Sequence, residues 1–149
     1  MRISSKYFRN FTFLLLLGLY ASCAAQEKDP WTPEQLIEPS ALASKLDLPK
    51  PQQPVIIDIG PAGVIKGALE AGPAEQKKNI EKVESLLKDV PKDKEVVIYC
   101  GCCPFSKCPN VRPAFKELEK LGYKNPRLLN LSHNLKKDWI DKGYPLEAQ

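Results

Sequence analysis

The sequence predicts an α/β fold: one domain with a parallel sheet and helices on both faces. Three short apolar runs, at residues 55–59, 96–99 and 128–131, have the length and composition of buried strands. Segments with apolar residues at helical spacing lie between and after these runs. Strands that alternate with helices are typical of parallel sheets, and in such folds the chemistry lies at the carboxyl ends of the strands.

The first half of the domain is expected to contain three helices. T-P-E-Q at residues 32–35 is a capping box and predicts a helix start, and Ser40 is expected to cap a short helix through Lys45. After the first strand, the glycine-rich residues 60–72 are expected to form a loop. Pro73 is expected to open a helix that runs to about residue 88.

The second half is expected to contain two helices, each ended by a glycine. Residues 111–121 carry an apolar stripe at helical spacing, and Gly122 follows them. Residues 132–142 predict the last helix, with Trp139 facing inward and Gly143 at its end. These elements complete an alternating order of strands and helices.

The first 25 residues have the order of a bacterial secretory signal. Basic residues precede an apolar run at 11–20, which is too short to span a bilayer, and small residues follow it. Two cleavage sites are open. Y-A-S-C at 20–23 resembles a lipoprotein box, in which the signal ends at residue 22 and Cys23 is acylated; the alternative is cleavage after Ala25. We expect an exported protein, periplasmic or lipid-anchored to the cell envelope, with a tether at 26–31 and a domain at 32–149.

The charge balance gives no indication of a nucleic-acid surface. The formal net charge is +4, but Arg2, Lys6 and Arg9 of the signal supply three of the 22 basic residues, which leaves 19 against 18 acidic residues. No later segment is long and apolar enough to cross a membrane. The only membrane contact that the sequence suggests is a lipid on Cys23.

Four of the five cysteines lie within nine positions, in the stretch V-V-I-Y-C-G-C-C-P-F-S-K-C at residues 96–108. The stretch begins with a predicted buried strand, and Cys100 stands at its carboxyl end. An oxidising periplasm makes idle free thiols a liability. Clustered thiols in an exported protein are therefore expected to be paired, metal-bound or chemically employed.

Several pieces, taken in order, resemble a rhodanese-like domain over about residues 32–145. They are V-I-I-D at 55–58, K-G-A at 66–68, V-V-I-Y-C at 96–100, L-G-Y at 121–123, Trp139, and G-Y-P at 143–145. The resemblance implies a sulfurtransferase that needs no cofactor and whose catalytic residue is Cys100. The chain departs from the family in three places. Gly60 stands where an Arg is usual, the loop after Cys100 is longer and has three extra cysteines, and Ser132-His133 replaces a Gly-Gly step.

Sulfur transfer is the favoured hypothesis. Backbone N–H groups and the dipole of the following helix are expected to stabilise a Cys100 thiolate. That thiolate would take a sulfane sulfur from thiosulfate or a persulfide, carry it as a persulfide, and pass it to a thiol acceptor. The expected substrate-binding loop comprises Gly101, Cys102, Cys103, Lys107, Cys108 and Arg112. Lys107 and Arg112 would attract an anionic donor, although Arg112 also suits a helix surface.

Three other readings remain open for the same loop. The C-x-x-C spacing of Cys100 and Cys103 is also a thiol–disulfide redox signature, with Cys102 or Cys108 as a resolving thiol, or a structural disulfide could close the loop. The four cysteines could instead hold zinc or an iron–sulfur cluster, although their spacing is unusual for either. A rhodanese-like fold that has become a non-catalytic binding module is the last alternative. Asp58 and His133 are expected to be structural.

Overall fold

The structure is a computed structural model that describes residues 31–61, 63 and 65–148. Within these residues five strands form one all-parallel sheet in the order β1-β5-β4-β2-β3. The strands are β1 (Leu36–Ile37), β2 (Val55–Asp58), β3 (Leu69–Glu70), β4 (Glu95–Tyr99) and β5 (Asn125–Leu129). This arrangement confirms the predicted α/β fold with a parallel sheet. The proposed signal and Cys23 lie outside the described residues.

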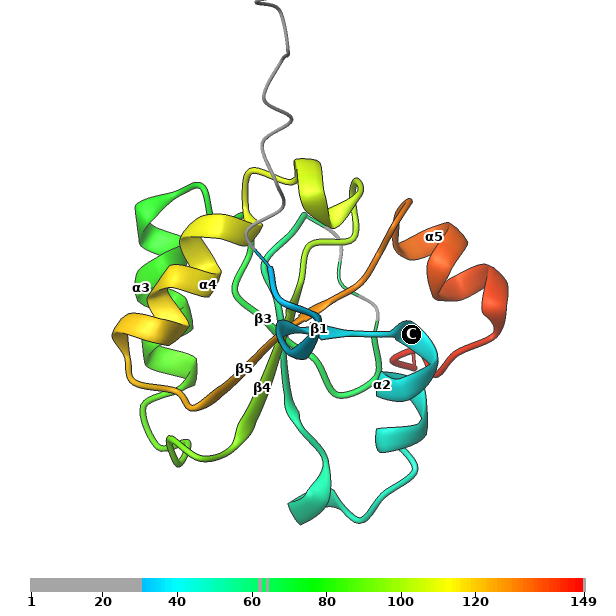
Figure 1. Cartoon of the computed structure of the whole chain (residues 1–149), viewed down its shortest axis with the longest axis horizontal. Helices are drawn as coiled ribbons and strands as arrows, with labels where there is room; N and C mark the ends of the chain where they lie inside the picture. Colours follow the sequence, from blue (N-terminus) through cyan, green and yellow to red (C-terminus); the bar gives the residue numbers. More distant parts are fainter. Residues whose placement is uncertain (1–30, 62, 64, 149) are drawn as a thin grey trace, which may run out of the picture. The chain divides into compact units, whose positions relative to one another are not determined.

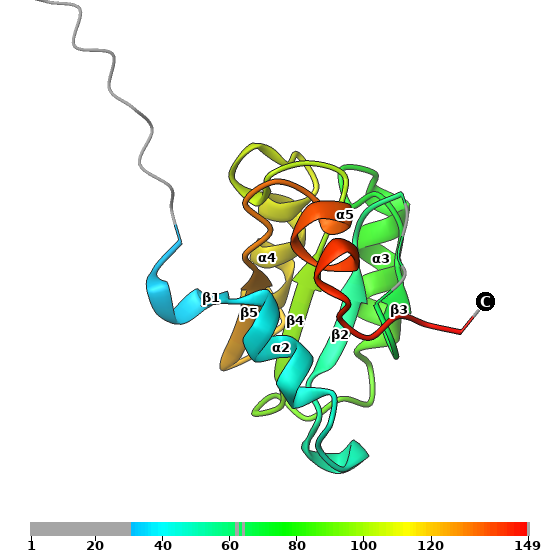
Figure 2. The same ribbon diagram turned by 90° about the vertical axis from the view of Figure 1, so that its right-hand side faces the viewer.

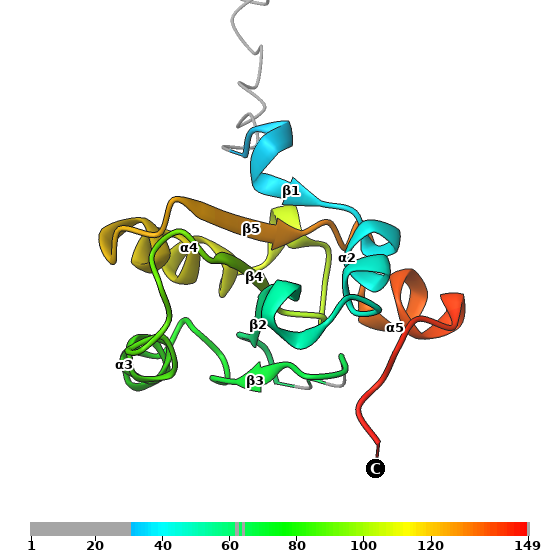
Figure 3. The ribbon, with the colours of Figure 1, turned by 90° about the horizontal axis from the view of Figure 1, so that it is seen from below.

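Helices cover both faces of the sheet (Figures 1 and 3). One face carries α3 (Lys77–Leu86) and α4 (Val111–Lys120); the other carries α2 (Pro39–Lys45) and α5 (Leu135–Asp138). Figure 2 shows α2 and α5 from the side of the face they cover. Among the described residues, no helix has the length and apolarity to span a membrane.

The strands divide their side chains between two cores because successive residues point to opposite faces. Along β4, Val96 and Ile98 pack on the α3 and α4 side, whereas Val97 and Tyr99 pack on the α2 and α5 side. The next residue in this alternation is Cys100, which joins the core beneath α4. The pleat of β4 therefore sets the direction of the Cys100 side chain.

Two short strands were not predicted, and both form through pairing at the edges of the sheet. The predicted first helix is a single 3-10 turn, η2 (Pro33–Gln35), in which Gln35 Oε1 accepts from the Thr32 N–H at 2.9 Å. The chain then pairs with β5 as β1. Similarly, β3 lies inside the expected 60–72 loop and pairs with β2. Two-residue strands leave too little periodic pattern for recognition from sequence.

Three predicted helix boundaries are wrong. The helix expected from Pro73 is α3 and begins at Lys77, because Ala71 and Ala74 donate their N–H groups to the carbonyls of Asp58 and Ile59. The last predicted helix is divided at Trp139 into α5 and η5 (Ile140–Lys142). Helix α2 begins at Pro39, so the predicted cap Ser40 lies inside the helix.

Candidate functional site

Cys100 lies at the carboxyl end of β4, the middle strand of the sheet, and only 4% of its surface is exposed. The following loop turns back over the sheet end. Gly101 has φ +82°, and a Cβ there would lie 3.0 Å from Leu135 Cβ, so this turn requires glycine. The Gly101 carbonyl accepts from the Leu135 N–H at 2.9 Å. This hydrogen bond ties the loop to the start of α5.

The loop brings four sulfur atoms together. Cys100 Sγ lies 3.2 Å from Cys102 Sγ, and Cys102 Sγ lies 3.4 Å from Cys103 Sγ. The sulfurs of Cys100, Cys102 and Cys108 all lie within 4.8 Å of one another. All four cysteines are free thiols; Cys100 and Cys108 are buried, Cys103 is half-buried and Cys102 is exposed. The four thiols that are clustered in the sequence therefore also lie together in space, and Cys102 is the one exposed to solvent.

Hydrogen bonds to the sulfur lower the pKa of Cys100 to about 5. The Cys108 thiol contributes most to this shift, and burial opposes it. The Asn110 side chain, whose Nδ2 donates at 3.3 Å, and the Cys102 backbone N–H add further stabilisation. These donors favour the thiolate because they bond more strongly to the charged sulfur.

The pKa values of the neighbouring thiols shift in the opposite direction. Donation to Cys100 raises the pKa of Cys108, with burial adding to the effect. Although the Cys102 residue is exposed, partial desolvation of its sulfur inside the cluster, followed by the contacts with Cys100 and Cys103, raises the pKa of Cys102 to about 12. Because these groups titrate as a set, the first proton leaves the cluster at mildly acidic pH and the charge resides on Cys100.

The expected backbone donor is present, because the Cys102 N–H stabilises the sulfur. Two side chains add to it: the Cys108 thiol, which contributes most, and Asn110, which directly precedes α4. The contribution expected from the helix dipole stays a prediction. Asn110 is 4% exposed, and its Oδ1 accepts from the Glu75 N–H at 2.9 Å, which fixes the amide so that Nδ2 faces Cys100. Sequence reasoning missed this residue. An Asn directly before an apolar helical stripe is a capping signal, but the Asn110 side chain makes no cap hydrogen bond, so that signal would have assigned it a different role.

Replacing Asn110 with Asp is predicted to raise the pKa of Cys100 by at least about one unit, because a donor becomes a second negative charge beside the thiolate. The Asp carboxylate can still accept from the Glu75 N–H, so the loop retains that support. The pH dependence of Cys100 alkylation, followed by peptide mass spectrometry, measures the shift. An unchanged midpoint would show that Asn110 does not act on the thiolate.

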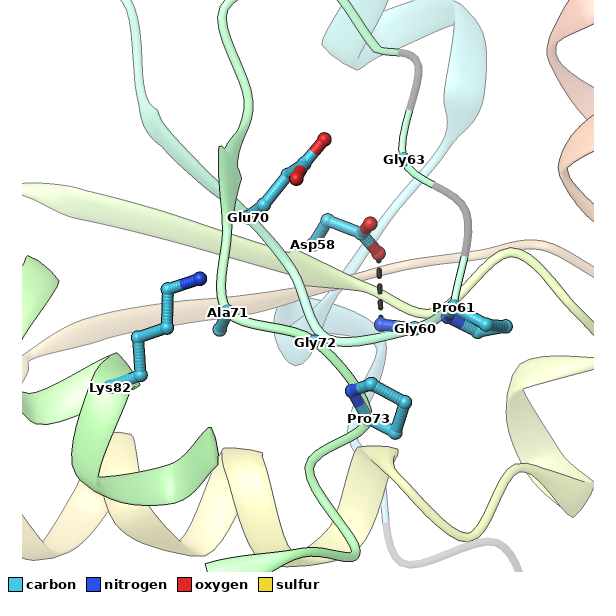
Figure 4. A pocket seen from close by; sticks show the side chains of 9 residues that line it. All are labelled: Asp58, Gly60, Pro61, Gly63, Glu70, Ala71, Gly72, Pro73 and Lys82. Atoms are coloured by element: carbon cyan, nitrogen blue, oxygen red, sulfur yellow. Dashed lines mark hydrogen bonds between the residues drawn. The ribbon is translucent and has the colours of Figure 1, made fainter. Parts of the chain in front are cut away.

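The end of β2 packs directly against the end of β4. A Cβ at Gly60 would lie 1.9 Å from the Cys100 carbonyl oxygen, so no side chain fits at this position. An Arg, which is usual at this place in the rhodanese family that the sequence resembles, would not fit here. Asp58 lies beside it, buried, and its Oδ1 accepts from the Gly60 N–H at 2.9 Å (Figure 4).

Asp58 lines a pocket of about 290 Å³ next to this strand junction (Figure 4). Its lining is formed by Asp58, Gly60, Pro61, Gly63, Glu70, Ala71, Gly72, Pro73 and Lys82. Burial raises the pKa of Asp58 to about 7, with smaller contributions from the charges of Cys100 and Glu70, while the Gly60 N–H opposes the shift. The hydrogen bond agrees with the structural role expected for Asp58, but the raised pKa was not anticipated.

Asp58→Asn is predicted to remove a pH dependence of folding stability. Between about pH 4 and pH 7 the folded protein holds a proton on Asp58 that the unfolded chain releases, so this group's contribution to stability falls as pH rises. Asn cannot ionise but can still accept from the Gly60 N–H. We expect the variant to be more stable than the wild type at pH 8, by on the order of a few kcal/mol, and nearly equal at pH 4. Urea unfolding at both pH values checks this; a difference that does not depend on pH would contradict it.

The charged residues expected at the site lie on its exterior. Lys107 is exposed at the end of η4 (Phe105–Lys107), and Arg112 is exposed on the first turn of α4. His133 is exposed, and its Nδ1 lies 3.0 Å from Asp138 Oδ1, which fits the expected structural role. Among the described residues, no hydrogen bond or ion pair joins Lys107 or Arg112 to the sulfurs, so their role in attracting an anion stays a prediction.

The sulfur cluster also has a donor set that suits soft metal ions. Cys100, Cys102 and Cys108 each offer one sulfur, and Cys103 lies against Cys102. Zinc with Zn–S bonds of about 2.3 Å holds tetrahedral sulfurs about 3.8 Å apart. The contacts of 3.2 and 3.4 Å between neighbouring sulfurs are closer than this and suit direct sulfur–sulfur chemistry better.

Neither a scan against protein-family models nor a search of curated proteins found a significant match to this chain.

Proposed function

We propose that this chain is a rhodanese-like sulfurtransferase that carries sulfane sulfur as a persulfide on Cys100. The observation that carries the proposal is the environment of this sulfur. It lies at the carboxyl end of the middle strand of a parallel sheet. Asn110 Nδ2 donates to it at 3.3 Å, and the sulfurs of Cys102 and Cys108 lie within 4.8 Å of it. Such an environment produces a thiolate at neutral pH, which is the nucleophilic form of cysteine.

The reaction begins with an anionic donor such as thiosulfate or a small persulfide. The Cys100 thiolate attacks the outer, sulfane sulfur of the donor, and the bond between that sulfur and the rest of the donor breaks. With thiosulfate, sulfite leaves with the electron pair and Cys100 retains the sulfur as a persulfide. Hydrogen bonds that stabilise the Cys100 thiolate also make it a good leaving group when a thiol acceptor removes the sulfur.

The setting proposed for this reaction is the bacterial cell envelope, with Cys23 as a possible lipid attachment site. The N-terminal sequence supports export, and four thiols kept together in an oxidising compartment favour a chemical use for them. No nucleic-acid partner is proposed.

Incubation of the reduced protein with thiosulfate tests the proposal. The tryptic peptide that contains Cys100 should gain about 32 Da, the mass of one sulfur atom, when the product is trapped at once with an alkylating agent. Added cyanide should remove this sulfur as thiocyanate. Absence of both products, or a zinc or iron ion retained at one per chain on the cysteines, would contradict the proposal.

A further inference from the structure

Resting on the proposed function, we propose that Cys102 resolves the Cys100 persulfide within the same chain. The carried sulfur then leaves as sulfide, and the protein is left with a Cys100–Cys102 disulfide. The partner class that completes the cycle is a thiol reductant, either a dithiol protein or a small thiol, which reduces this disulfide. This assigns a distinct role to one of the three extra cysteines.

The distance between the two sulfurs supports this step. Cys100 Sγ and Cys102 Sγ are 3.2 Å apart, and a disulfide bond of about 2.05 Å requires them to approach by about 1.2 Å. A sulfur atom placed between Cys100 Sγ and Cys102 Sγ, at one such bond length from each, needs these two atoms to be about 4.1 Å apart. The outer sulfur of a Cys100 persulfide therefore does not fit between Cys100 Sγ and Cys102 Sγ. The outer sulfur must project elsewhere, which leaves the inner sulfur open to attack by Cys102.

Burial distinguishes Cys102 from the other thiols near Cys100. Cys108 is 1% exposed and forms part of the core beneath α4, and it serves as the main hydrogen-bond donor to Cys100. A disulfide formed by Cys108 would be enclosed. Cys102 is exposed, so a disulfide that includes it presents one sulfur to a reductant in solution.

The turn at Gly101 holds the two sulfurs in contact. Its φ of +82° and its carbonyl bond to the Leu135 N–H fix the only residue between Cys100 and Cys102. A nucleophile held this close reacts as part of one molecule and does not depend on collision with an external acceptor. Attack by Cys102 on the Cys100 persulfide therefore competes well with transfer of the carried sulfur to a thiol in solution.

The atoms and electrons of the cycle balance. The Cys102 sulfur attacks the inner sulfur of the Cys100 persulfide; a new sulfur–sulfur bond joins the two cysteines, and the bond to the outer sulfur breaks. The outer sulfur takes the electron pair and the proton of the Cys102 thiol and leaves as hydrogen sulfide or its anion. Two thiol groups of the reductant then supply two electrons and two protons, return both cysteines to thiols, and become a disulfide.

A single-turnover experiment on the full chain tests this assignment. The reduced protein is desalted, mixed with excess thiosulfate, or with a small-molecule persulfide in parallel, and sampled for sulfide and for intact mass. The wild type should release one sulfide per chain and become about 2 Da lighter, with the disulfide mapped to Cys100 and Cys102. Cys102→Ser should instead retain about 32 Da on Cys100, with a persulfide lifetime longer by on the order of tenfold or more.

Cys102→Ala is the second variant, because it removes the same thiol without leaving a hydroxyl beside Cys100, and it should retain the persulfide as Cys102→Ser does. Lys116→Ser, at an exposed position of α4, is the control and should behave as the wild type does. A wild-type protein that keeps its persulfide without releasing sulfide, or a disulfide that maps to Cys100 and Cys108, would overturn the role of Cys102 while leaving sulfur carriage intact. If the wild type releases no sulfide and Cys102→Ser gains no sulfur, with either donor, the proposed function and this inference are overturned together.

Discussion

Cys100→Ser is expected to abolish thiocyanate formation from thiosulfate and cyanide, lowering the rate by on the order of 10³-fold or more. The hydroxyl of serine remains protonated at neutral pH, so no anionic nucleophile remains at the end of β4. The measurement is the initial rate of thiocyanate formation at saturating thiosulfate, together with the mass of the peptide that contains residue 100.

Cys103→Ser provides the comparison for this prediction. Cys103 lies against Cys102 but is absent from the groups that stabilise the Cys100 thiolate. Its replacement should change the rate by less than about threefold if Cys100 alone carries the sulfur. Equal losses in the two variants, with folded circular dichroism spectra, would show that the sulfur is carried by the cluster as a whole or by another thiol.

Gly60→Ala is expected to lower the free energy of unfolding by about 3 kcal/mol, the upper range for overpacking a closed site. The added methyl group would lie 1.9 Å from the Cys100 carbonyl oxygen, so β2 and β4 must separate at their carboxyl ends. This displacement also moves Cys100 relative to Asn110, and we expect sulfur transfer to fall together with stability. Urea unfolding and the thiocyanate assay report the two effects.

Gly122→Ala is the matched control, because it tests whether close packing causes the stability loss expected for Gly60→Ala. Gly122 has φ +81° and nothing within 4 Å of an added Cβ, so alanine there meets only the cost of the left-handed backbone, about 1 kcal/mol. The position ends α4 at the end away from the sulfurs, so activity should be retained. Equal destabilisation by the two substitutions would contradict close packing at Gly60 as the specific cause.

The central strands were predictable because buried parallel strands are short, continuous apolar runs with clear boundaries. The runs at 55–59 and 96–99 match β2 and β4 to within one residue at each end, and the placement of Cys100 follows directly from the second. The helix that Gly122 ends was equally clear, because its apolar stripe repeats over three turns. Each of these features depends on local sequence alone.

The remaining features depend on contacts between distant segments. Strands β1 and β3 exist through their pairing with β5 and β2, which no local pattern encodes. The spacing of the cysteines could not show that their sulfurs converge, because the turn at Gly101 and the 3-10 turn η4 decide their directions. The need for glycine at position 60 arises from the Cys100 carbonyl, which is distant in sequence but lies beside it in the fold.

The central claim is that Cys100 is a thiolate at neutral pH, and its own titration tests this most directly. The rate of alkylation of Cys100, measured from pH 3 to pH 10 by mass spectrometry of its peptide, should rise with a midpoint near the pKa of about 5. A midpoint near the ordinary cysteine value of about 8.5 would contradict the account, because the surrounding donors would then not stabilise the sulfur anion.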